Sequence, residues 1–482
     1  MTPDFSLLIP EMLLAGLGFA VLGVDLLVRD DRRNAATSAT AAVGMAAITA
    51  FSLVFMWDKQ EALYGGLYKV DQYALLFKAF FLVAGVVTVL MSVEYVGRRM
   101  RHPGEYYSLI VFSILGAVML AAAGELLTAY IALELLSFSM YVLVSLARGD
   151  RRSAEAGTKY ILLGALSSAI LLYGVSILYG TLGTTVFGPM NALLSFSLDR
   201  PTVLVGFAML LAGFGFKLAA VPFHMWAPDI YEGAPTPVTA HLSVLSKAAA
   251  FALVLRFFAE AMPSSIDQWQ LVLAIIAAAT MTVGNLTALA QTNIKRLLAY
   301  SSIGQVGFLM VGLVALSPGA SNALLLHLVG YAFTNLAVFM VVIAVENHTG
   351  KEEISDFAGL ADRTPLSAMT MTAALFSLAG LPFFAGFVTK FYLFTEAGNQ
   401  GLLWLAGLAM ANSLISLYYY LRIVRQMYVE EPADRTPIPL PGLTALVLVA
   451  MLAGTIFVGI YPGPFVDLIQ VANESLGLVA SP

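Results

Sequence analysis

The sequence predicts an all-α polytopic membrane protein with about fourteen transmembrane helices. Apolar residues make up 59% of the 482 residues, charged residues only 11%, and the mean hydropathy is +0.84. A soluble domain of this length would carry about a quarter charged residues. Long apolar stretches also follow one another with no long polar segment between them, and a spanning helix needs about 20 such residues.

The fourteen predicted helices together form a single transmembrane domain, residues 1–482. They are expected at residues 5–28, 35–56, 73–97, 106–123, 125–147, 158–182, 201–227, 235–259, 269–290, 297–316, 322–346, 366–396, 402–428 and 440–461. Within the domain, 1–105 carries helices 1 to 3 and 440–461 is helix 14. The stretch 187–200 is too short to span and is expected to lie in the membrane interface.

Lysine and arginine in the loops predict the orientation. Loops after odd-numbered helices hold most of them, from Arg29 to Arg435, and loops after even-numbered helices hold only Lys59, Lys69 and Arg200. The odd-to-even loops should therefore be cytoplasmic, with both termini outside. The N-terminus lacks the basic region of a cleavable signal peptide, so we expect the first helix to be retained.

A faint internal repeat links the two halves. The motif "AAVPF" (219–223) in helix 7 recurs as "AGLPF" (379–383) in helix 12, and "LVLRFF" (253–258) resembles "YYLRIV" (419–424). Five predicted helices separate the members of each pair, so the second unit, 269–428, is expected to be inverted relative to the first, 106–260. Inverted repeats with broken helices are typical of transporters.

Ionisable residues lie deep in several predicted helices. Lys217 and Lys247 lie midway along helices 7 and 8, Glu134 lies at similar depth in helix 5, and Lys390 lies in helix 12. A charge at mid-bilayer costs at least about 2.5–3.5 kcal/mol, so such groups must face the protein interior, pair or become neutral. Glu134 is the expected partner of Lys217. The two residues form either a static ion pair or part of a proton relay in which the distance between their side chains changes.

Other basic residues lie nearer the helix ends. Lys78, Arg256 and Arg422 are expected to extend to the membrane interface. Lys159, near the start of helix 6, either does the same or feeds the proton path.

Prolines predict breaks beside two of the lysines. Pro222 cannot donate to the carbonyl of Leu218, and Pro382 leaves the carbonyl of Leu378 free. These breaks are either packing kinks or openings that hold water near the lysines. His224 follows the first break and is either a neutral, satisfied histidine or a relay member.

Several functional classes are excluded or disfavoured. The chain has no cysteine, which excludes disulfides and cysteine-held iron–sulfur clusters in this chain. A net charge of −5 gives no reason to expect nucleic-acid binding. No nucleotide-binding motif or metal-ligand cluster is found, so we expect no cofactor and no redox chemistry in this chain itself.

Two motifs resemble a known family. The stretch "FKLAAVPFHMWAPDIYEGAPTPVTAHLSVLSKAAAF" (216–251) and "NIKRLLAYSSIGQVGF" (293–308) resemble the antiporter-like subunits of proton-pumping NADH:quinone oxidoreductase, respiratory complex I. "PDIYEGAPTPVTA" with "SKAA" resembles the N-type subunits in particular, the counterparts of mitochondrial subunit 2. The resemblance extends over nearly the whole chain.

The resemblance implies fourteen helices, with helices 4–8 and 9–13 as inverted repeats and helices 7 and 12 broken. It implies proton-relay roles for Glu134, Lys217, Lys247 and Lys390, and matches His224 to a family histidine. The chain would be one subunit of a translocase in a bacterial inner membrane. FMN, iron–sulfur clusters and quinone would belong to partner subunits.

Two positions depart from the family pattern. Gln305 stands where some relatives have histidine, and His241 where many N-type chains have an aromatic residue. For His241 and His327 we prefer a structural role. Two further functions remain open: a Mrp-type cation/proton antiporter subunit without a redox partner, and a structural membrane scaffold.

Overall fold

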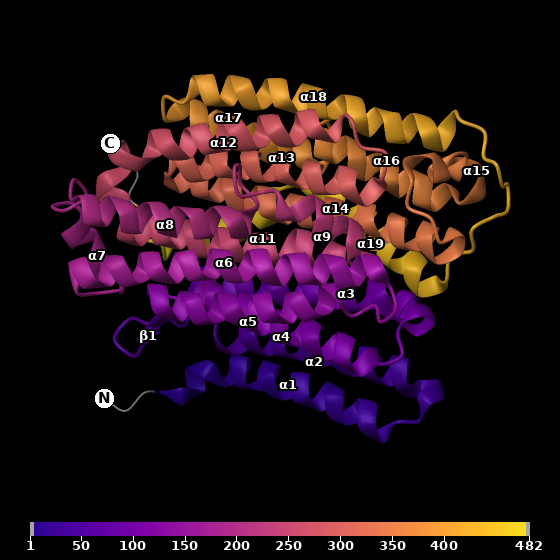
Figure 1. Cartoon of the computed structure of the whole chain (residues 1–482), viewed down its shortest axis with the longest axis horizontal. Coiled ribbons are helices and arrows are strands. Elements are labelled where there is room, and N and C mark those ends of the chain that lie inside the picture. Colours follow the sequence, from indigo (N-terminus) through magenta and orange to yellow (C-terminus); the bar gives the residue numbers. More distant parts are fainter. Residues whose placement is uncertain (1–3, 479–482) are drawn as a thin grey trace.

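The computed structural model describes residues 4–478 as one bundle of roughly parallel helices (Figure 1). Its first half comprises the 3-10 turn Phe5–Leu8 and helices α1 (Ile9–Leu27), α2 (Asp30–Phe55), α3 (Gln72–Arg99), α4 (Pro103–Ala122), α5 (Leu126–Val144), α6 (Arg151–Leu182), α7 (Phe187–Leu194), α8 (Pro201–Leu218), α9 (Trp226–Gly233), α10 (Thr236–His241) and α11 (Lys247–Ala261). Both ends of the described chain lie at the same end of the bundle (Figure 1), as an even number of crossings requires.

The second half contains the remaining helices. They are α12 (Ile266–Ala288), α13 (Ile294–Ala315), α14 (Pro318–Thr349), α15 (Leu360–Arg363), α16 (Pro365–Ala379), α17 (Ala385–Asn399), α18 (Leu403–Tyr428), α19 (Gly442–Ile460) and α20 (Gly463–Glu474). Short 3-10 turns cover Pro263–Ser265 and Ile354–Phe357. The two strands β1 (Glu61–Leu63) and β2 (Tyr68–Val70) form an antiparallel hairpin that the sequence did not predict, and α20 was also missed.

The predicted membrane fold is confirmed. Twelve helices within residues 4–478 are long and apolar enough to cross a membrane. The broken pair α16–α17 and the 26-residue α18 complete the fourteen crossings. The predicted interfacial stretch contains the eight-residue α7, which is too short to span.

Local sequence signals set many of the helix starts. Side chains of Asp71, Glu125, Asp150, Asn293 and Ser317 accept from backbone amides at the starts of α3, α5, α6, α13 and α14. Such caps satisfy amides that have no partner within the helix. Prolines stand in the first turn of α4, α8, α14 and α16, where the missing N–H costs nothing.

The two halves repeat the same packing. Helix α4 packs on α5 and α6 on α8, and in the second half α12 packs on α13 and α14 on α16. The helices α6 and α14 occupy equivalent places and both have 32 residues. These pairings agree with the inverted five-helix repeats inferred from the sequence.

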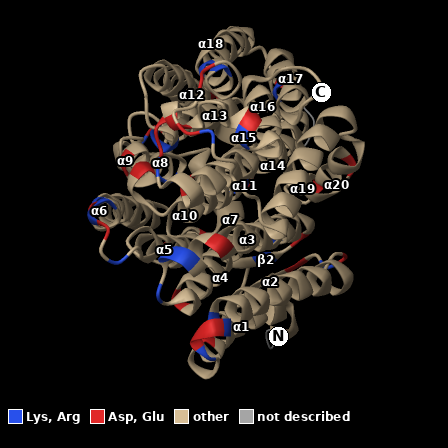
Figure 2. Cartoon of the chain, turned by 90° about the vertical axis from the view of Figure 1, so that its right-hand side faces the viewer, with Lys and Arg blue, Asp and Glu red and all other residues tan. Residues whose placement is uncertain are grey.

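Many charged residues lie at the end of the bundle opposite the termini (Figure 2). Some charged residues lie inside the bundle, and for two of them the prediction of a position at the membrane interface is wrong. Lys78 and Arg256 do not extend to an interface. The Lys78 ammonium lies 2.5 Å from the Glu11 carboxylate, and the Arg256 side chain is fully buried. Folding brings each an acid from a distant segment, which satisfies the charge inside the protein.

Arg256 ties the helices α11, α3 and α4 together. Its guanidinium donates to both carboxylate oxygens of Asp71 at 2.7 and 2.8 Å, to Glu260 at 3.0 Å and to the carbonyl of Ala121 at 3.1 Å. Burial alone would raise the pKa of the Asp71 carboxyl, but the pairing with Arg256 outweighs burial and holds this pKa below its usual value. Asp71 is therefore ionised at neutral pH.

Replacement of Asp71 by asparagine should destabilise the protein. Asparagine still caps α3 but leaves Glu260 as the one charged partner of Arg256 among residues 4–478. The expected loss is at the lower end of the ~3–5 kcal/mol that breaking a buried pair costs, seen as a lower melting temperature of the detergent-solubilised protein. Asp267→Asn, at an exposed position in the first turn of α12, is the control. Equal melting temperatures for both variants would contradict the assignment.

Candidate functional site

The first helix break lies immediately beside Lys217. Helix α8 ends at Leu218, Ala219 adopts a left-handed conformation (φ 59°), and α9 begins only at Trp226. The amide of Ala220 donates to the carbonyl of Gly215 at 2.8 Å and the amide of Ala219 to Phe216 at 3.0 Å, which closes the helix end as a Schellman motif. The predicted break at Pro222 is confirmed.

The second break has the same geometry. Helix α16 ends at Ala379, Gly380 is left-handed (φ 85°), and the amides of Leu381 and Gly380 donate to Phe376 and Ser377 at 3.0 and 2.9 Å. The break predicted at Pro382 is therefore confirmed as well. The same hydrogen-bond pattern ends both helices at equivalent places of the two halves. This identifies α8–α9 and α16–α17 as a repeat-related pair.

Lys217 is buried and donates to a serine. Its Nζ lies 2.7 Å from the Ser137 hydroxyl on α5, and 5.9 and 5.7 Å from the ring centres of Tyr141 and Phe216. The aromatic faces add a weak attraction for the ammonium.

The expected direct pair between Lys217 and Glu134 is not made in this structure. Glu134 lies one turn before Ser137 and accepts from Ser168 at 2.5 Å. Lys217 reaches Ser137 instead, so the serine occupies the place that the carboxylate was expected to fill.

Lys247 follows a local widening of its helix. Residues Leu242–Ser246 form one π-helical turn between α10 and α11, a feature often found at functional sites. The Lys247 ammonium donates to the Ser302 hydroxyl. Ser302 lies 2.7 Å from the hydroxyl of Tyr331, which donates to the carbonyl of Ser243 at 3.2 Å. A chain of hydroxyl groups, Ser302 and Tyr331, thus leads away from Lys247.

Lys390 uses the carbonyl that Pro382 frees. Its Nζ donates to the Leu378 carbonyl at 2.7 Å and to the Ser413 hydroxyl at 2.9 Å. The amide of Gln305 donates to the same Leu378 carbonyl at 3.1 Å. The sequence placed water at this carbonyl, and the structure places the lysine itself there.

The three lysines share one pattern. Each is buried, and none forms an ion pair with a carboxylate in the part of the chain that the structure describes; each donates to a neutral hydroxyl or carbonyl. A small cavity of about 10 Å³ lies between Lys217 and Ser246, the residue before Lys247. This is about the volume that one water molecule needs. The sequence did not single out the serines, because a helical serine ordinarily bonds its own backbone.

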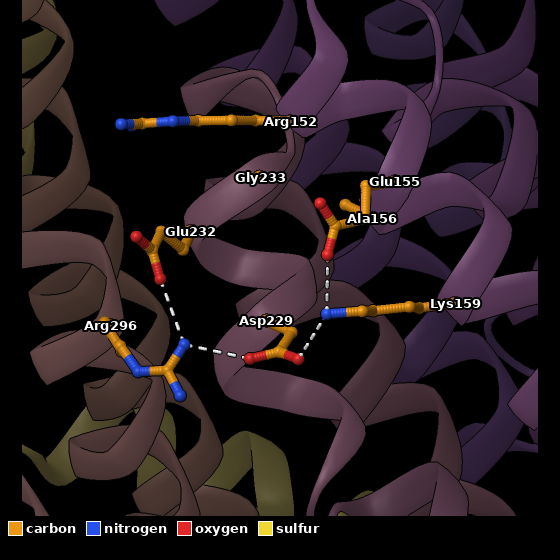
Figure 3. Close-up of a pocket in the computed structure, with 8 residues that line it drawn as sticks. All are labelled: Arg152, Glu155, Ala156, Lys159, Asp229, Glu232, Gly233 and Arg296. Carbon is orange, nitrogen blue, oxygen red and sulfur yellow. Dashed lines mark hydrogen bonds and ion pairs between the residues drawn. The ribbon is translucent and has the colours of Figure 1, made fainter.

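Lys159 lines a charged cavity together with Glu155, Asp229, Glu232 and Arg296 (Figure 3). The cavity has a volume of about 230 Å³. The Lys159 ammonium lies 2.8 Å from both Glu155 and Asp229, and Arg296 bridges Asp229 and Glu232 at 2.9 and 3.0 Å. The two acids of α9, Asp229 and Glu232, are therefore paired with bases from α6 and α13.

The charge of Asp229 follows from these contacts. Partial burial would raise the pKa of its carboxyl, but hydrogen bonds and ion pairs with Lys159 and Arg296 outweigh burial and lower this pKa below its usual value. Asp229 is ionised at neutral pH and holds both bases at the cavity.

The histidines differ in their surroundings. His224 lies in the first break, and its Nδ1 has no hydrogen-bond partner among residues 4–478. His241 is buried between two hydroxyl groups, with Ser113 at 2.8 Å and Thr88 at 3.3 Å. The Nδ1 atom of His327 lies 2.7 Å from the Thr389 hydroxyl group and either accepts from it or donates to it.

Comparison with known proteins agrees with this geometry. Residues 123–416 match the family model described as the NADH:quinone oxidoreductase/Mrp antiporter transmembrane family. A NADH-quinone oxidoreductase subunit N from Desulforamulus reducens is 44% identical over 98% of both chains, and one from Moorella thermoacetica is 45% identical over 96% of this chain and 97% of its own. The chain belongs to the family of NADH-quinone oxidoreductase N subunits.

Solved structures support the same family assignment. A chain of respiratory complex I from Thermus thermophilus with bound aureothin is 32% identical, with a TM-score of 0.81, over 96% of this chain and all of that one. A chain of the Mrp complex from Dietzia has a TM-score of 0.87 over 99% of this chain and 98% of its own, but only 21% identity. The Mrp likeness therefore shows the fold shared beyond the N-subunit family.

Within this N-subunit chain, Ser137 offers a direct test of the Lys217 contact. Ser137→Ala removes the hydroxyl group that accepts from Lys217 and should lower proton pumping several-fold. Ser139→Ala is the matched control, because this serine lies on the same helix and donates only to the carbonyl of Leu135 at 2.9 Å. Pumping is measured with a pH-sensitive dye in membrane vesicles, per assembled complex. Equal pumping in both variants would contradict the role of Ser137.

Proposed function

We propose that this chain is the antiporter-like, proton-translocating membrane subunit of an NADH:quinone oxidoreductase. It works as one subunit of a translocase together with other membrane and hydrophilic subunits. FMN, iron–sulfur clusters and quinone reside in those partners, and this chain itself carries out no redox chemistry. The observation that supports the proposal most strongly is a set of three buried lysines, two of them beside repeat-related helix breaks, in a chain with full-length N-subunit relatives.

The relay consists of Glu134, Lys217, Lys247 and Lys390, with Lys159 and His224 at its margin. A serine hydroxyl oxygen accepts hydrogen bonds. It can accept from a charged lysine and equally from a neutral lysine, which keeps two N–H groups, so the hydrogen bonds to Ser137, Ser302 and Ser413 survive a change of protonation. A permanent carboxylate partner would favour the charged lysine alone.

Glu134 acts as the switch. It lies one turn from Ser137 and is held by Ser168. Movement of its carboxylate towards Lys217 stabilises a proton there, and movement away favours release to the next group. Water at the small cavity beside Ser246 links Lys217 to Lys247.

The chain is placed in a bacterial inner membrane with both termini on the outer side. The excess of lysine and arginine in loops at the opposite end supports this orientation. Residues 106–260 and 269–428 are the two repeat units of the single domain, flanked by 1–105 and by helix 14.

The Mrp-type alternative has less support. Its solved example is only 21% identical, whereas relatives at about the 40% level carry the oxidoreductase name. Affinity purification of the tagged chain from native membranes should recover flavin and iron–sulfur subunits. Recovery of small antiporter subunits without redox centres would favour the Mrp function instead.

Glu134→Gln should reduce both proton pumping and coupled quinone reduction, because a neutral amide cannot shift the protonation of Lys217. The variant is nearly isosteric and keeps an oxygen for Ser168. Both rates are measured in membranes with the complex assembled, with Glu396→Gln near the end of α17 as control. Undiminished rates in Glu134→Gln would remove Glu134 from the relay and favour a scaffold role.

A further inference from the structure

A second cavity, larger than the one at Lys159, opens beside it. It has a volume of about 610 Å³, and the two cavities share Arg152, Glu232 and Gly233 in their walls. Six acids, Glu346 among them, and four bases line the larger cavity. Acids outnumber bases at an end of the bundle otherwise rich in arginine. An acidic cleft concentrates cations, protons included.

Glu346 lies deepest among these acids. Its residue is 3% exposed, and its carboxylate lies 3.0 Å from Arg99 and accepts from the Thr236 hydroxyl group. Thr236 is the first residue of α10, and α10 leads through the π-helical turn to Lys247. The cavity therefore reaches the helix that carries this lysine.

One face of α3 continues inward from the same cavity. Tyr95 lines the cavity, and Ser92 and Thr88 follow at helical spacing on the same side. All three are buried. The Ser92 hydroxyl lies 2.7 Å from that of Tyr106 and donates to the Thr88 carbonyl at 2.6 Å. From Tyr95 to Thr88 these polar groups descend about 10 Å along the helix.

His241 lies at the inner end of this series. Its Nδ1 is 3.3 Å from the Thr88 hydroxyl and its Nε2 is 2.8 Å from the Ser113 hydroxyl. Hydroxyl groups on both sides can donate or accept. The ring can therefore take up a proton at Nδ1, form an imidazolium, and release the other proton from Nε2, which leaves it neutral again.

Beyond His241 the next titratable group on this helix is Lys247. Helix α4, which carries Ser113, packs against the turn Leu242–Ser246. Ser243 in that turn belongs to the hydroxyl network of Lys247, since its carbonyl accepts from Tyr331 and its hydroxyl accepts from Asn335 at 2.5 Å. Lys247 has no carboxylate partner of its own among residues 4–478 and donates to the Ser302 hydroxyl group.

We propose that the cavity, Glu346 and His241 form a proton-uptake branch that supplies Lys247 separately from the Lys159 cavity. The inference rests on the proposed function and adds to it an entrance for protons at the larger cavity.

The test uses the complete complex reconstituted into liposomes, with proton translocation followed by a pH-sensitive dye. His241→Gln keeps a donor and an acceptor for Thr88 and Ser113 but cannot titrate, and His241→Phe keeps only ring volume. Both variants, and Glu346→Gln, should slow translocation several-fold per assembled complex. Glu105→Gln is the control, because Glu105 forms a partly exposed pair with Arg148 outside both cavities.

Each result either supports the proton-uptake branch or rules it out. Slow translocation in both His241 variants supports the branch. Normal translocation in His241→Gln overturns it, whether or not His241→Phe is impaired, because hydrogen bonding without titration would then suffice. Normal translocation in Glu346→Gln overturns the entrance. Glu134→Gln is assayed alongside: if it is impaired while His241→Gln is normal, only this inference fails, and if it is normal, the relay itself fails.

Discussion

The structure depends on how an ammonium group is accommodated inside a membrane. A charge at that depth is costly unless protein groups replace water around it. Here Lys217, Lys247 and Lys390 each donate to a hydroxyl or carbonyl oxygen and not to a carboxylate. Neutral acceptors reduce the cost of the charge without fixing it, which leaves the lysine free to release its proton. The buried pairs Arg256–Asp71 and Lys78–Glu11 show the contrasting arrangement, in which a carboxylate holds the charge in place.

The broken and widened helices follow from the same requirement. A regular helix uses its own carbonyls, so an acceptor for a buried lysine must come from another element or from an interrupted helix. At Pro382 the interruption frees the Leu378 carbonyl, which Lys390 and Gln305 share. At Pro222 the helix ends just after Lys217, and α5 supplies Ser137. The inverted repeat places these two interrupted helices in equivalent positions of the two halves.

Much of the fold could be predicted from the sequence, because apolar length, prolines and loop charges act locally. The crossings and both breaks follow from such signals. The partners of buried charges could not be predicted, because tertiary packing brings them from far along the chain: Asp71 to Arg256, and Glu11 to Lys78. The Lys217–Glu134 pair was expected from depth alone, but the rotation of α5 presents Ser137 to the lysine. A hairpin of three-residue strands and a short terminal helix carry too little periodicity to detect.

If Lys217 carries a transported proton, Lys217→Ala in the assembled complex tests its role most directly. Proton pumping and NADH:quinone activity are measured in the same membranes. Both should be lost, because the relay between Glu134 and Lys247 would be interrupted and electron transfer is coupled to it. Retention of both activities would show that Lys217 is structural and carries no transported proton.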